Sequence, residues 1–249
     1  REELIDQTEH VPQHQPTTGA TNAHRIKLDH LQTFSALTPN QEKFFELYRG
    51  GAYCIGLFGS PGVGKSFLAM YRAIEEVLDR STPYKQVVVI RSTVPSREIG
   101  FLPGTEEEKI AIYELPYREI AQTLFNRPDA WDRLKEQGYA RCISSSFVRG
   151  ISIDDSIIIV EEAQNYTWQE LSSVITRTGH RSKIIFTGDL FQNDLVRQKN
   201  DQSGLEQFLD VLRSMGEFQE IFFTPDDIVR SSLVKKFIQA CAKKGLLPG

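Results

Sequence analysis

Short apolar runs alternate with longer stretches of helical periodicity along most of the chain. Each run is a few residues long, rich in Ile, Val and Phe, and almost continuously apolar. Such runs are typical of parallel strands that are buried on both faces. The expected strands cover 52–58, 86–90, 140–144, 156–160, 183–187 and 218–223.

The segments between these runs carry the 3.6-residue period of amphipathic helices. A helix that joins two parallel strands must cross back over the sheet, so it covers one of the faces. The sequence therefore predicts an α/β fold, with a mostly parallel sheet and helices on both faces. The expected helices cover 38–49, 65–80, 106–125 with a break at Pro116, 129–137, 167–176, 204–215 and 227–244.

The N-terminal residues differ in character from the rest of the chain. Residues 1–25 mix charge with Gln, Thr, His and Pro and show no apolar period, so we expect a flexible tail. No repeat and no Pro-rich or Gly/Ser-rich linker follows residue 30. With 249 residues, of which 40% are apolar, the chain can bury a cooperative core. Residues 26–249 are predicted to form a single domain.

The charge balance is mildly acidic but uneven. The chain has 29 Lys and Arg against 33 Asp and Glu, a net charge of −4, which disfavours a protein that coats nucleic acid by bulk charge. Residues 200–229 hold seven acidic side chains and one basic, whereas 230–249 hold Arg230, four lysines and no acid. No apolar run reaches the ~18–20 residues of a membrane span. We expect a cytoplasmic protein without membrane contact.

Cysteine and histidine do not suggest a metal site. Cys54, Cys142 and Cys241 are far apart, and four of the five histidines fall within the first 30 residues. Neither the C-x-x-C spacing nor a Cys/His cluster of a zinc site is present. Free thiols in a reducing compartment are the expectation.

Residues 59–66, Gly-Ser-Pro-Gly-Val-Gly-Lys-Ser, match the phosphate-loop pattern G-x-x-x-x-G-K-S/T. The match follows an expected strand and opens an expected helix, as the mechanism requires. Backbone N–H groups of such a loop wrap phosphates, Lys65 reaches the outer phosphates, and the Ser66 hydroxyl is a ligand for Mg²⁺. We therefore expect ATP and Mg²⁺ to bind. The expected nucleotide contacts are Gly59, Ser60, Pro61, Gly62, Val63, Gly64, Lys65, Ser66 and Phe67.

Two acidic residues follow the fourth expected strand. Glu161 is a candidate for the metal site, and Glu162 is a candidate base that polarises the attacking water. Paired acids in this position also occur as ordinary charges at a helix N-terminus. Gln192, after the next strand, is interpreted as a contact for the γ-phosphate or the water, with a plain Gly188-Asp189 turn as the less favoured alternative.

Motifs in a fixed order resemble those of the PhoH-like family of phosphate-starvation-inducible ATPases, whose fold is similar to the RecA-like core of superfamily one helicases. They span about residues 38–242. The motifs are GSPGVGKS, IIIVEEAQN, SKIIFTGDLFQNDL and DDIVRSSLVKKF, with RSTVP, GFLPG and FVRG between the first two.

The resemblance implies roles for individual residues. Gln41 would contact adenine, Lys65 and Ser66 the phosphates and Mg²⁺, and Glu162 would be the base. Gln192 would be the γ-phosphate sensor. The chain departs from the family at Glu161, where Asp is usual.

Phosphoryl transfer also needs an arginine that neutralises charge on the γ-phosphate. The chain has room for one core of this kind, so the arginine must come from a later segment or from a neighbouring subunit. The candidates are Arg230 and Arg177, with a capping or surface arginine as the alternative for each. A homo-oligomeric ring, by resemblance a hexamer, would supply the residue between subunits.

The resemblance implies single-stranded nucleic acid as the partner, with RNA favoured over DNA. The expected function is Mg²⁺-dependent ATP hydrolysis coupled to translocation or remodelling of that strand. A nucleotide-switched interaction protein is the main alternative, and a small-molecule kinase is disfavoured because no lid-like arginine cluster is present. Candidate strand contacts, which could equally be core aromatics and solvated charges, are Arg91, Arg97, Arg141, Arg149, Tyr113, Tyr117 and Phe147.

Overall fold

The computed structural model describes residues 25–92, 112–189 and 204–244. Six strands form one sheet in the order β3-β2-β4-β5-β1-β6, and every neighbouring pair is parallel. All six expected strands and their parallel pairing are confirmed. The strands are β1 (Cys54–Gly59), β2 (Gln86–Arg91), β3 (Ala140–Ser144), β4 (Ser156–Glu161), β5 (Lys183–Gly188) and β6 (Phe218–Phe223).

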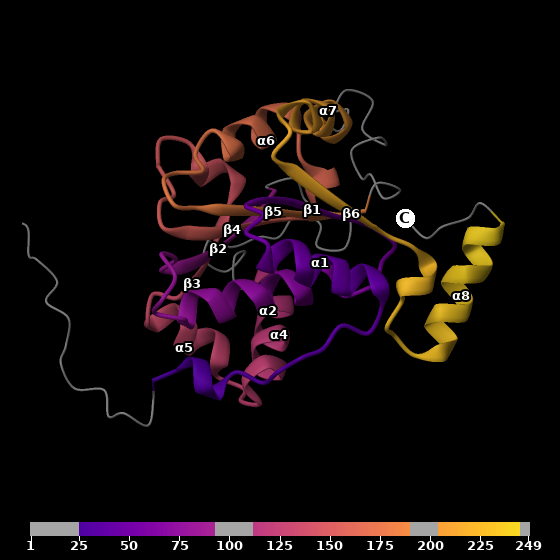
Figure 1. Cartoon of the computed structure of the whole chain (residues 1–249), viewed down its shortest axis with the longest axis horizontal. Coiled ribbons are helices and arrows are strands. Elements are labelled where there is room, and N and C mark those ends of the chain that lie inside the picture. The colour runs from indigo at the N-terminus through magenta and orange to yellow at the C-terminus, as the bar shows by residue number, and fades with distance from the viewer. Residues whose placement is uncertain (1–24, 93–111, 190–203, 245–249) are drawn as a thin grey trace, which may run out of the picture.

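Helices cover both faces of the sheet (Figure 1). One face carries α1 (Pro39–Arg49), α2 (Lys65–Leu78), α4 (Leu115–Phe125) and α5 (Ala130–Glu136). The other carries α6 (Trp168–Ile175) and α7 (Leu205–Met215). The 3₁₀ turns are η2 (Leu28–His30), η3 (Ser145–Val148), η4 (Ala163–Asn165) and η6 (Pro225–Asp227), and α8 (Ser232–Lys243) ends the described chain.

The sheet separates two apolar cores because successive side chains of a strand point to opposite faces. In β1, Ile55 and Leu57 pack against the layer that contains α1 and α2, and Phe58 packs against the layer of α6 and α7. Burial on both sides explains why the strands are continuously apolar in the sequence.

The expected interruption of a helix near Pro116 is present: residues 112–113 are helical, Glu114 is a turn, and α4 begins at Leu115. Pro116 lies in the first turn of α4, where its missing N–H costs nothing. One expected helix boundary was wrong. The last helix begins at Ser232 rather than at 227. Thr224 and Asp227 form a reciprocal capping box that completes η6, and the chain then runs extended before α8.

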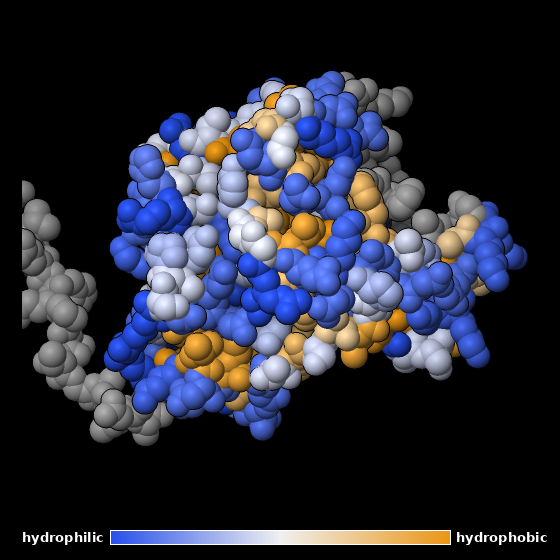
Figure 2. Space-filling model, in the orientation of Figure 1, coloured by the Kyte–Doolittle hydropathy of each residue, from blue (hydrophilic) through white to orange (hydrophobic). Residues whose placement is uncertain are grey.

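Helix α8 projects from the body of the molecule beside β6 (Figure 1). Its packing partners are chiefly in η6, and Ile238 is its one buried residue. Leu233 and Phe237 are 76% and 61% exposed. Figure 2 shows largely hydrophilic surface on the side of α8 that faces the viewer. Within the described parts of the chain, no helix combines the length and apolar character needed to cross a membrane.

Candidate functional site

A cavity of about 780 Å³ opens where the carboxyl ends of β1, β4 and β5 meet. This edge of a parallel α/β sheet is the usual place for a ligand. Its lining combines the phosphate loop with acidic and basic side chains from later strands and turns. They include Gly62, Gly64, Lys65, Ser66, Glu162, Asp189 and Arg230.

The phosphate loop has the strained backbone that its glycines permit. Gly59, Gly62 and Gly64 have φ values of 120°, 76° and 88°, a region that residues with a Cβ rarely adopt. At Gly59 a Cβ would also overlap the carbonyl of Phe223, which accepts a 3.1 Å hydrogen bond from the N–H of Ser60. The end of β6 therefore holds the start of the loop in place.

Lys65 opens α2 and lies within the loop. Its Nζ donates to the carbonyl oxygens of Gly59 at 2.7 Å and Ser60 at 2.9 Å. Burial lowers the pKa of Lys65 below its ordinary value, although Asp189, Glu162 and Glu161 favour the charged form. The ammonium group is thus partly desolvated, so water screens its attraction to an anionic phosphate less than it would at the surface.

Ser66, in the first turn of α2, contacts Glu161, the last residue of β4. The Ser66 hydroxyl donates to Glu161 Oε2 at 2.8 Å, although the residues are 95 positions apart. Glu161 is 3% exposed, and its Oε1 is buried without a hydrogen-bond partner among the described residues. Burial, followed by the charge of Glu162, raises the pKa of Glu161. Two hard oxygen donors with an unsatisfied buried carboxylate oxygen fit the chemistry that Mg²⁺ prefers.

Glu162 has a left-handed backbone, with φ of 55°. Its Oε2 accepts a 2.6 Å hydrogen bond from Nε2 of Gln164, whose Oε1 accepts from the N–H of Asp189 at 3.0 Å. Gln164 is 3% exposed and Asp189 is 4% exposed. A non-glycine residue in this conformation costs free energy and marks a functional position more often than a random one.

The sequence reasoning missed Gln164 and Asp189. Both lie in the motifs that were singled out, Gln164 two residues after Glu162 and Asp189 directly after β5. Asp189 lines the cavity, and Gln164 packs so closely that a Cβ at Gly188 would meet its Oε1 at 2.6 Å. The glycine before the acid was the available signal, because it permits this close approach.

The expected adenine contact, Gln41, lies at the cavity with its amide already engaged. Oε1 accepts from the N–H of Leu37 at 2.7 Å, and Nε2 donates to the carbonyl of Val63 at 3.1 Å. Gln41 is 3% exposed and joins the chain before α1 to the phosphate loop. Pro61 and Phe67 line the cavity, whereas Ser60 and Val63 are buried beneath it. Gln192 lies outside the described residues.

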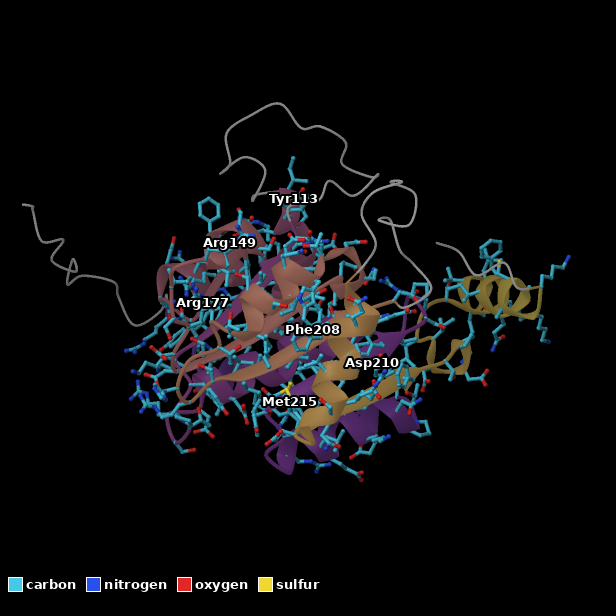
Figure 3. The ribbon with its side chains drawn as sticks, turned by 90° about the horizontal axis from the view of Figure 1, so that it is seen from above. Tyr113, Arg149, Arg177, Phe208, Asp210 and Met215 are labelled. Carbon is cyan, nitrogen blue, oxygen red and sulfur yellow. The ribbon has the colours of Figure 1, made fainter. Side chains whose placement is uncertain are left out.

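The two candidate arginines lie in different places. Arg230 lines the cavity of its own chain, and a Cβ at Gly62 would meet its Cγ at 3.0 Å. The N–H of Val229 also donates to the carbonyl of Gly62 at 3.3 Å. Arg177 follows α6, is exposed and does not line the cavity. Figure 3 places Arg177 with Arg149 on the side of the molecule away from α8.

The residues expected to contact a nucleic-acid strand differ in how exposed they are. Phe147 is 47% exposed and lies in η3, the turn after β3, and Arg149, which directly follows η3, is exposed. Arg91 is half-buried with its guanidinium 5.4 Å from the ring centre of Tyr113. Tyr117 is 1% exposed and packs on a tryptophan, so the core interpretation of this residue was right and stacking on a base is not available to it. Arg141 is half-buried in β3, and Arg97 lies outside the described residues.

Comparison with known sequences identifies relatives over most of the chain. A family model described as PhoH-like protein matches residues 33–242. The PhoH-like proteins of Mycobacterium tuberculosis and Mycobacterium bovis are 30% identical over 213 residues, which cover 85% of this chain and 59% of theirs. The PhoH-like protein of Bacillus subtilis is 33% identical over 187 residues, covering 75% and 57%. The chain thus spans less than two thirds of these relatives' length.

Solved structures with a related arrangement include the large terminase of the thermophilic bacteriophage D6E and the Pif1 protein of Bacteroides in complex with ADP-AlF4. The first has a TM-score of 0.47 at 15% identity and covers 84% of this chain and 50% of its own. The second has a TM-score of 0.42 at 11% identity, covering 87% and 48%. The chain thus has an α/β core, with a parallel sheet covered on both faces and a phosphate loop after β1, and it belongs to the PhoH-like family.

Proposed function

We propose that the chain binds and hydrolyses ATP with Mg²⁺. Hydrolysis is coupled to translocation or remodelling of a single strand of nucleic acid, with RNA preferred over DNA. The observation that carries the proposal is the 2.8 Å hydrogen bond between Ser66 and Glu161. It brings the phosphate loop and the acidic end of β4 together at one cavity, where Glu162 and Lys65 also lie. The phosphate loop, the proposed metal ligands and the proposed base are thereby supplied by one chain.

The roles follow from the positions of these side chains. Lys65 would neutralise the outer phosphates, and Ser66 with Glu161 would hold the metal ion. Mg²⁺, when bound, offsets negative charge on the phosphates. Glu162 is held by Gln164 at the cavity wall, where its carboxylate can accept a proton from the attacking water. Gln192 keeps its proposed role as γ-phosphate sensor.

The nucleic-acid part of the proposal is supported by η3, the turn that follows β3. Exposed Phe147 offers a face for base stacking, and exposed Arg149, two residues later, can pair with a phosphate. β3 is the neighbour of β2, which in turn pairs with β4 that ends in Glu161. A nucleic-acid strand bound at Phe147 and Arg149 would lie at the same edge of the sheet as Glu161 and Glu162.

A ring remains the economical source of an arginine that acts between subunits. Arg177 is exposed on the side away from α8, so it is available to a neighbouring copy. Arg230 already lies at the cavity of its own chain. We propose that Arg230 acts within the subunit and Arg177 across a hexameric ring.

One observation favours the alternative, a nucleotide-switched interaction protein. The apolar side chains of Leu233, Val234 and Phe237 on α8 are exposed, and α8 begins two residues after Arg230. A helix of this kind can bind a partner, and its position could depend on the nucleotide. ATP would then control docking, with turnover incidental.

Turnover with and without a strand separates the two functions. We expect saturating single-stranded RNA to raise the steady-state ATPase rate, and Phe147→Ala with Arg149→Ala to remove the stimulation while the basal rate stays. Glu162→Gln should abolish turnover while ATP binding, measured by calorimetry, remains. Since a positioned general base contributes about 10²- to 10⁴-fold, the loss should be of that order.

The contrary results are equally definite. An ATPase rate that neither RNA nor DNA changes, together with an assembly state that ATP changes, would favour the switch. An ATPase rate that rises with single-stranded DNA but not with RNA would show that the bound strand is DNA. Full turnover by Glu162→Gln would remove Glu162 from the role of base.

A further inference from the structure

The carboxylate of Glu170 lies where three elements meet. Glu170 is half-buried in the first turn of α6. Its Oε1 accepts a 2.6 Å hydrogen bond from the hydroxyl of Ser145, the first residue of η3, and a 3.3 Å bond from the hydroxyl of Ser92, which directly follows β2. Its Oε2 accepts from the N–H of Thr167 at 2.9 Å and from the hydroxyl of Thr167 at 3.0 Å. One side chain therefore joins α6, η3 and the end of β2.

These contacts go beyond the capping of a helix. The capping box formed by Thr167 and Glu170 uses Oε2, so Oε1 is left for the other two elements. A carboxylate only accepts hydrogen bonds, at about four lone-pair sites, and the described residues supply four donors. Ser145 and Ser92 are buried, so water competes little for their hydroxyl groups. Hydrogen bonds to a charged acceptor in such a place are among the stronger ones in a protein.

One end of this connection is the turn that carries the proposed base. Glu162 is the N-cap of η4, and its carbonyl accepts a 2.9 Å hydrogen bond from the N–H of Asn165. Thr167, the N-cap of α6, follows two residues later. Between them, the buried hydroxyl of Tyr166 donates to the carbonyl of Ile90 in β2 at 2.8 Å. The segment from Glu162 to α6 is thus short and hydrogen-bonded, so a displacement of Glu162 is passed on to the start of α6.

The other end is the turn proposed to contact the nucleic-acid strand. This turn, η3, begins at Ser145, contains the exposed Phe147 and is followed by the exposed Arg149. Val148 of η3 is buried in the same core as apolar side chains of α6. The apolar contact holds η3 against α6, and the directional hydrogen bond from Ser145 to Glu170 fixes its orientation.

We propose that Glu170 is a positioning residue that couples the nucleotide site to the nucleic-acid strand. It holds η3 in one orientation relative to the turn that carries Glu162, so each ligand changes the affinity for the other through this side chain. The inference rests on the proposed function, since it assumes that ATP binds beside Glu162 and that the strand binds at Phe147 and Arg149. Couplings of this kind change affinities by roughly 5- to 150-fold.

The quantity to measure is the coupling factor, the ratio of two affinities for the same RNA. A fluorescein-labelled oligouridylate is titrated with the full chain, with and without a non-hydrolysable ATP analogue and Mg²⁺, and fluorescence anisotropy gives the two dissociation constants. By thermodynamic linkage, calorimetric titration of the analogue with and without the RNA must give the same factor. For wild type we expect a factor of roughly 5 to 150.

Two variants remove the connection and keep the cap of α6. Glu170→Asp retains a carboxylate for the cap, as Asp227 does in the capping box of η6, but its side chain is one methylene too short to reach Ser145 as well. Ser145→Ala removes the same hydrogen bond from the other side. Both variants should still bind each ligand alone, and both should have a coupling factor close to one. Stimulation of the ATPase rate by RNA should fall with it.

Thr167→Ala is the matched control. It removes the hydroxyl that accepts from the N–H of Glu170 and caps α6, but it leaves the hydrogen bond between Ser145 and Glu170. The variant should unfold at a lower urea concentration than wild type, because a helix cap is lost, and should keep the wild-type coupling factor. A merely structural role of Glu170 predicts instead that stability and coupling fall together.

The failures of the two proposals are distinguishable. A wild-type protein that does not bind the RNA, and whose ATPase rate the RNA does not change, would overturn the strand part of the proposed function. A wild-type factor of one despite stimulation by RNA, or wild-type coupling in Glu170→Asp and Ser145→Ala, would overturn the role of Glu170 while the proposed function stands. Loss of RNA binding by both variants without nucleotide, or loss of coupling in Thr167→Ala, would show a structural role and would overturn it as well.

Discussion

Gln164 holds the carboxylate of Glu162 by a 2.6 Å hydrogen bond from Nε2 to Oε2. Through its other amide atom it accepts from the backbone N–H of Asp189 at 3.0 Å, so one buried side chain joins the ends of β4 and β5. The left-handed backbone of Glu162 leaves its orientation dependent on such a partner. Gln164 is therefore a positioning residue for the proposed base.

Gln164→Ala should lower kcat for ATP with little change in KM. The carboxylate of Glu162 would remain but lose its orientation, so we expect about a tenfold loss, a part of the 10²- to 10⁴-fold that a positioned base supplies. Gln164 does not line the cavity, which is why substrate binding should persist. Steady-state kinetics and calorimetric ATP titration measure the two effects separately.

The neighbour Asn165 provides the matched control. It lies in the same turn η4, and its buried Oδ1 has no hydrogen-bond partner among the described residues. Asn165→Ala should leave kcat near the wild-type value. A Gln164→Ala protein with normal kcat, or one with raised KM alone, would contradict the positioning role.

Mixing experiments can assign the two arginines. Lys65→Ala disables the phosphate loop, so Lys65→Ala subunits supply only what they give to a neighbour. Mixed with Arg177→Ala subunits at equal ratio, they should restore activity at about a quarter of the sites if Arg177 acts between subunits. Mixed with Arg230→Ala, they should restore nothing, because Arg230 lies at its own loop.

The readout is the ATPase rate at several mixing ratios, with the solution mass recorded for each mixture. Recovery with Arg230→Ala would place that arginine between subunits instead. No recovery with Arg177→Ala at any ratio, in an assembly of normal mass, would argue against the ring.

Asp227 should make the turn before Arg230 sensitive to acid. Burial raises the pKa of this carboxyl group, but hydrogen bonds from the N–H of Thr224 and from Asn40 outweigh it, and the pKa lies below its ordinary value of 3.8. A lowered native pKa adds stability above the unfolded pKa and loses it as pH falls through the native one. The stabilisation should therefore be complete near neutral pH and disappear below about pH 4.

The variant Asp227→Asn tests whether ionised Asp227 stabilises the fold above pH 4. At neutral pH the variant should lose about 1 kcal/mol of unfolding free energy, because a capping carboxylate is replaced by a weaker acceptor. The difference from wild type in urea denaturation should shrink as the pH falls below 4. A difference that is constant from pH 7 to pH 3 would show that ionisation of Asp227 does not contribute.

Gly51 provides a control for a substitution at Gly59 in the phosphate loop. Both have positive φ, 120° and 86°, but a Cβ at Gly51 would meet nothing within 4 Å, whereas one at Gly59 would overlap the carbonyl of Phe223. Gly51→Ala should cost only the strain of about 1–2 kcal/mol. Gly59→Ala should cost more and should also remove ATP binding. Equal midpoints in urea for the two variants would show that the contact with β6 is not constraining.

The sequence predicted the strands well because burial on both faces leaves a direct mark on composition. Every run of β-branched and aromatic residues became a strand, with ends shifted by one or two residues, as for β1. The order of the strands was not predictable in this way. Apolar character reports that a strand is buried and not which strand lies beside it, so the position of β5 between β1 and β4 needed the structure.

In the candidate site too, contacts within one motif were predictable and contacts between motifs were not. Residues within one motif, such as Lys65 and Ser66, could be placed together from their spacing alone. The contact of Ser66 with Glu161 was anticipated only as a shared metal site, and the link from Gln164 to Asp189 was not anticipated at all. Such contacts arise where different strands end at one edge, and no local pattern encodes that distance.

The place of β1 in the sheet has a consequence for synthesis on the ribosome. Among the described strands β1 is the first to be made, yet its partners there are β5 and β6, and Cys54 pairs with Ile184 and Phe218. The strand that carries the phosphate loop must therefore wait, unpaired and apolar, until well over a hundred further residues have emerged. The nucleotide site can form only after β6 has been made, so a nascent chain cut short of β6 would not acquire it.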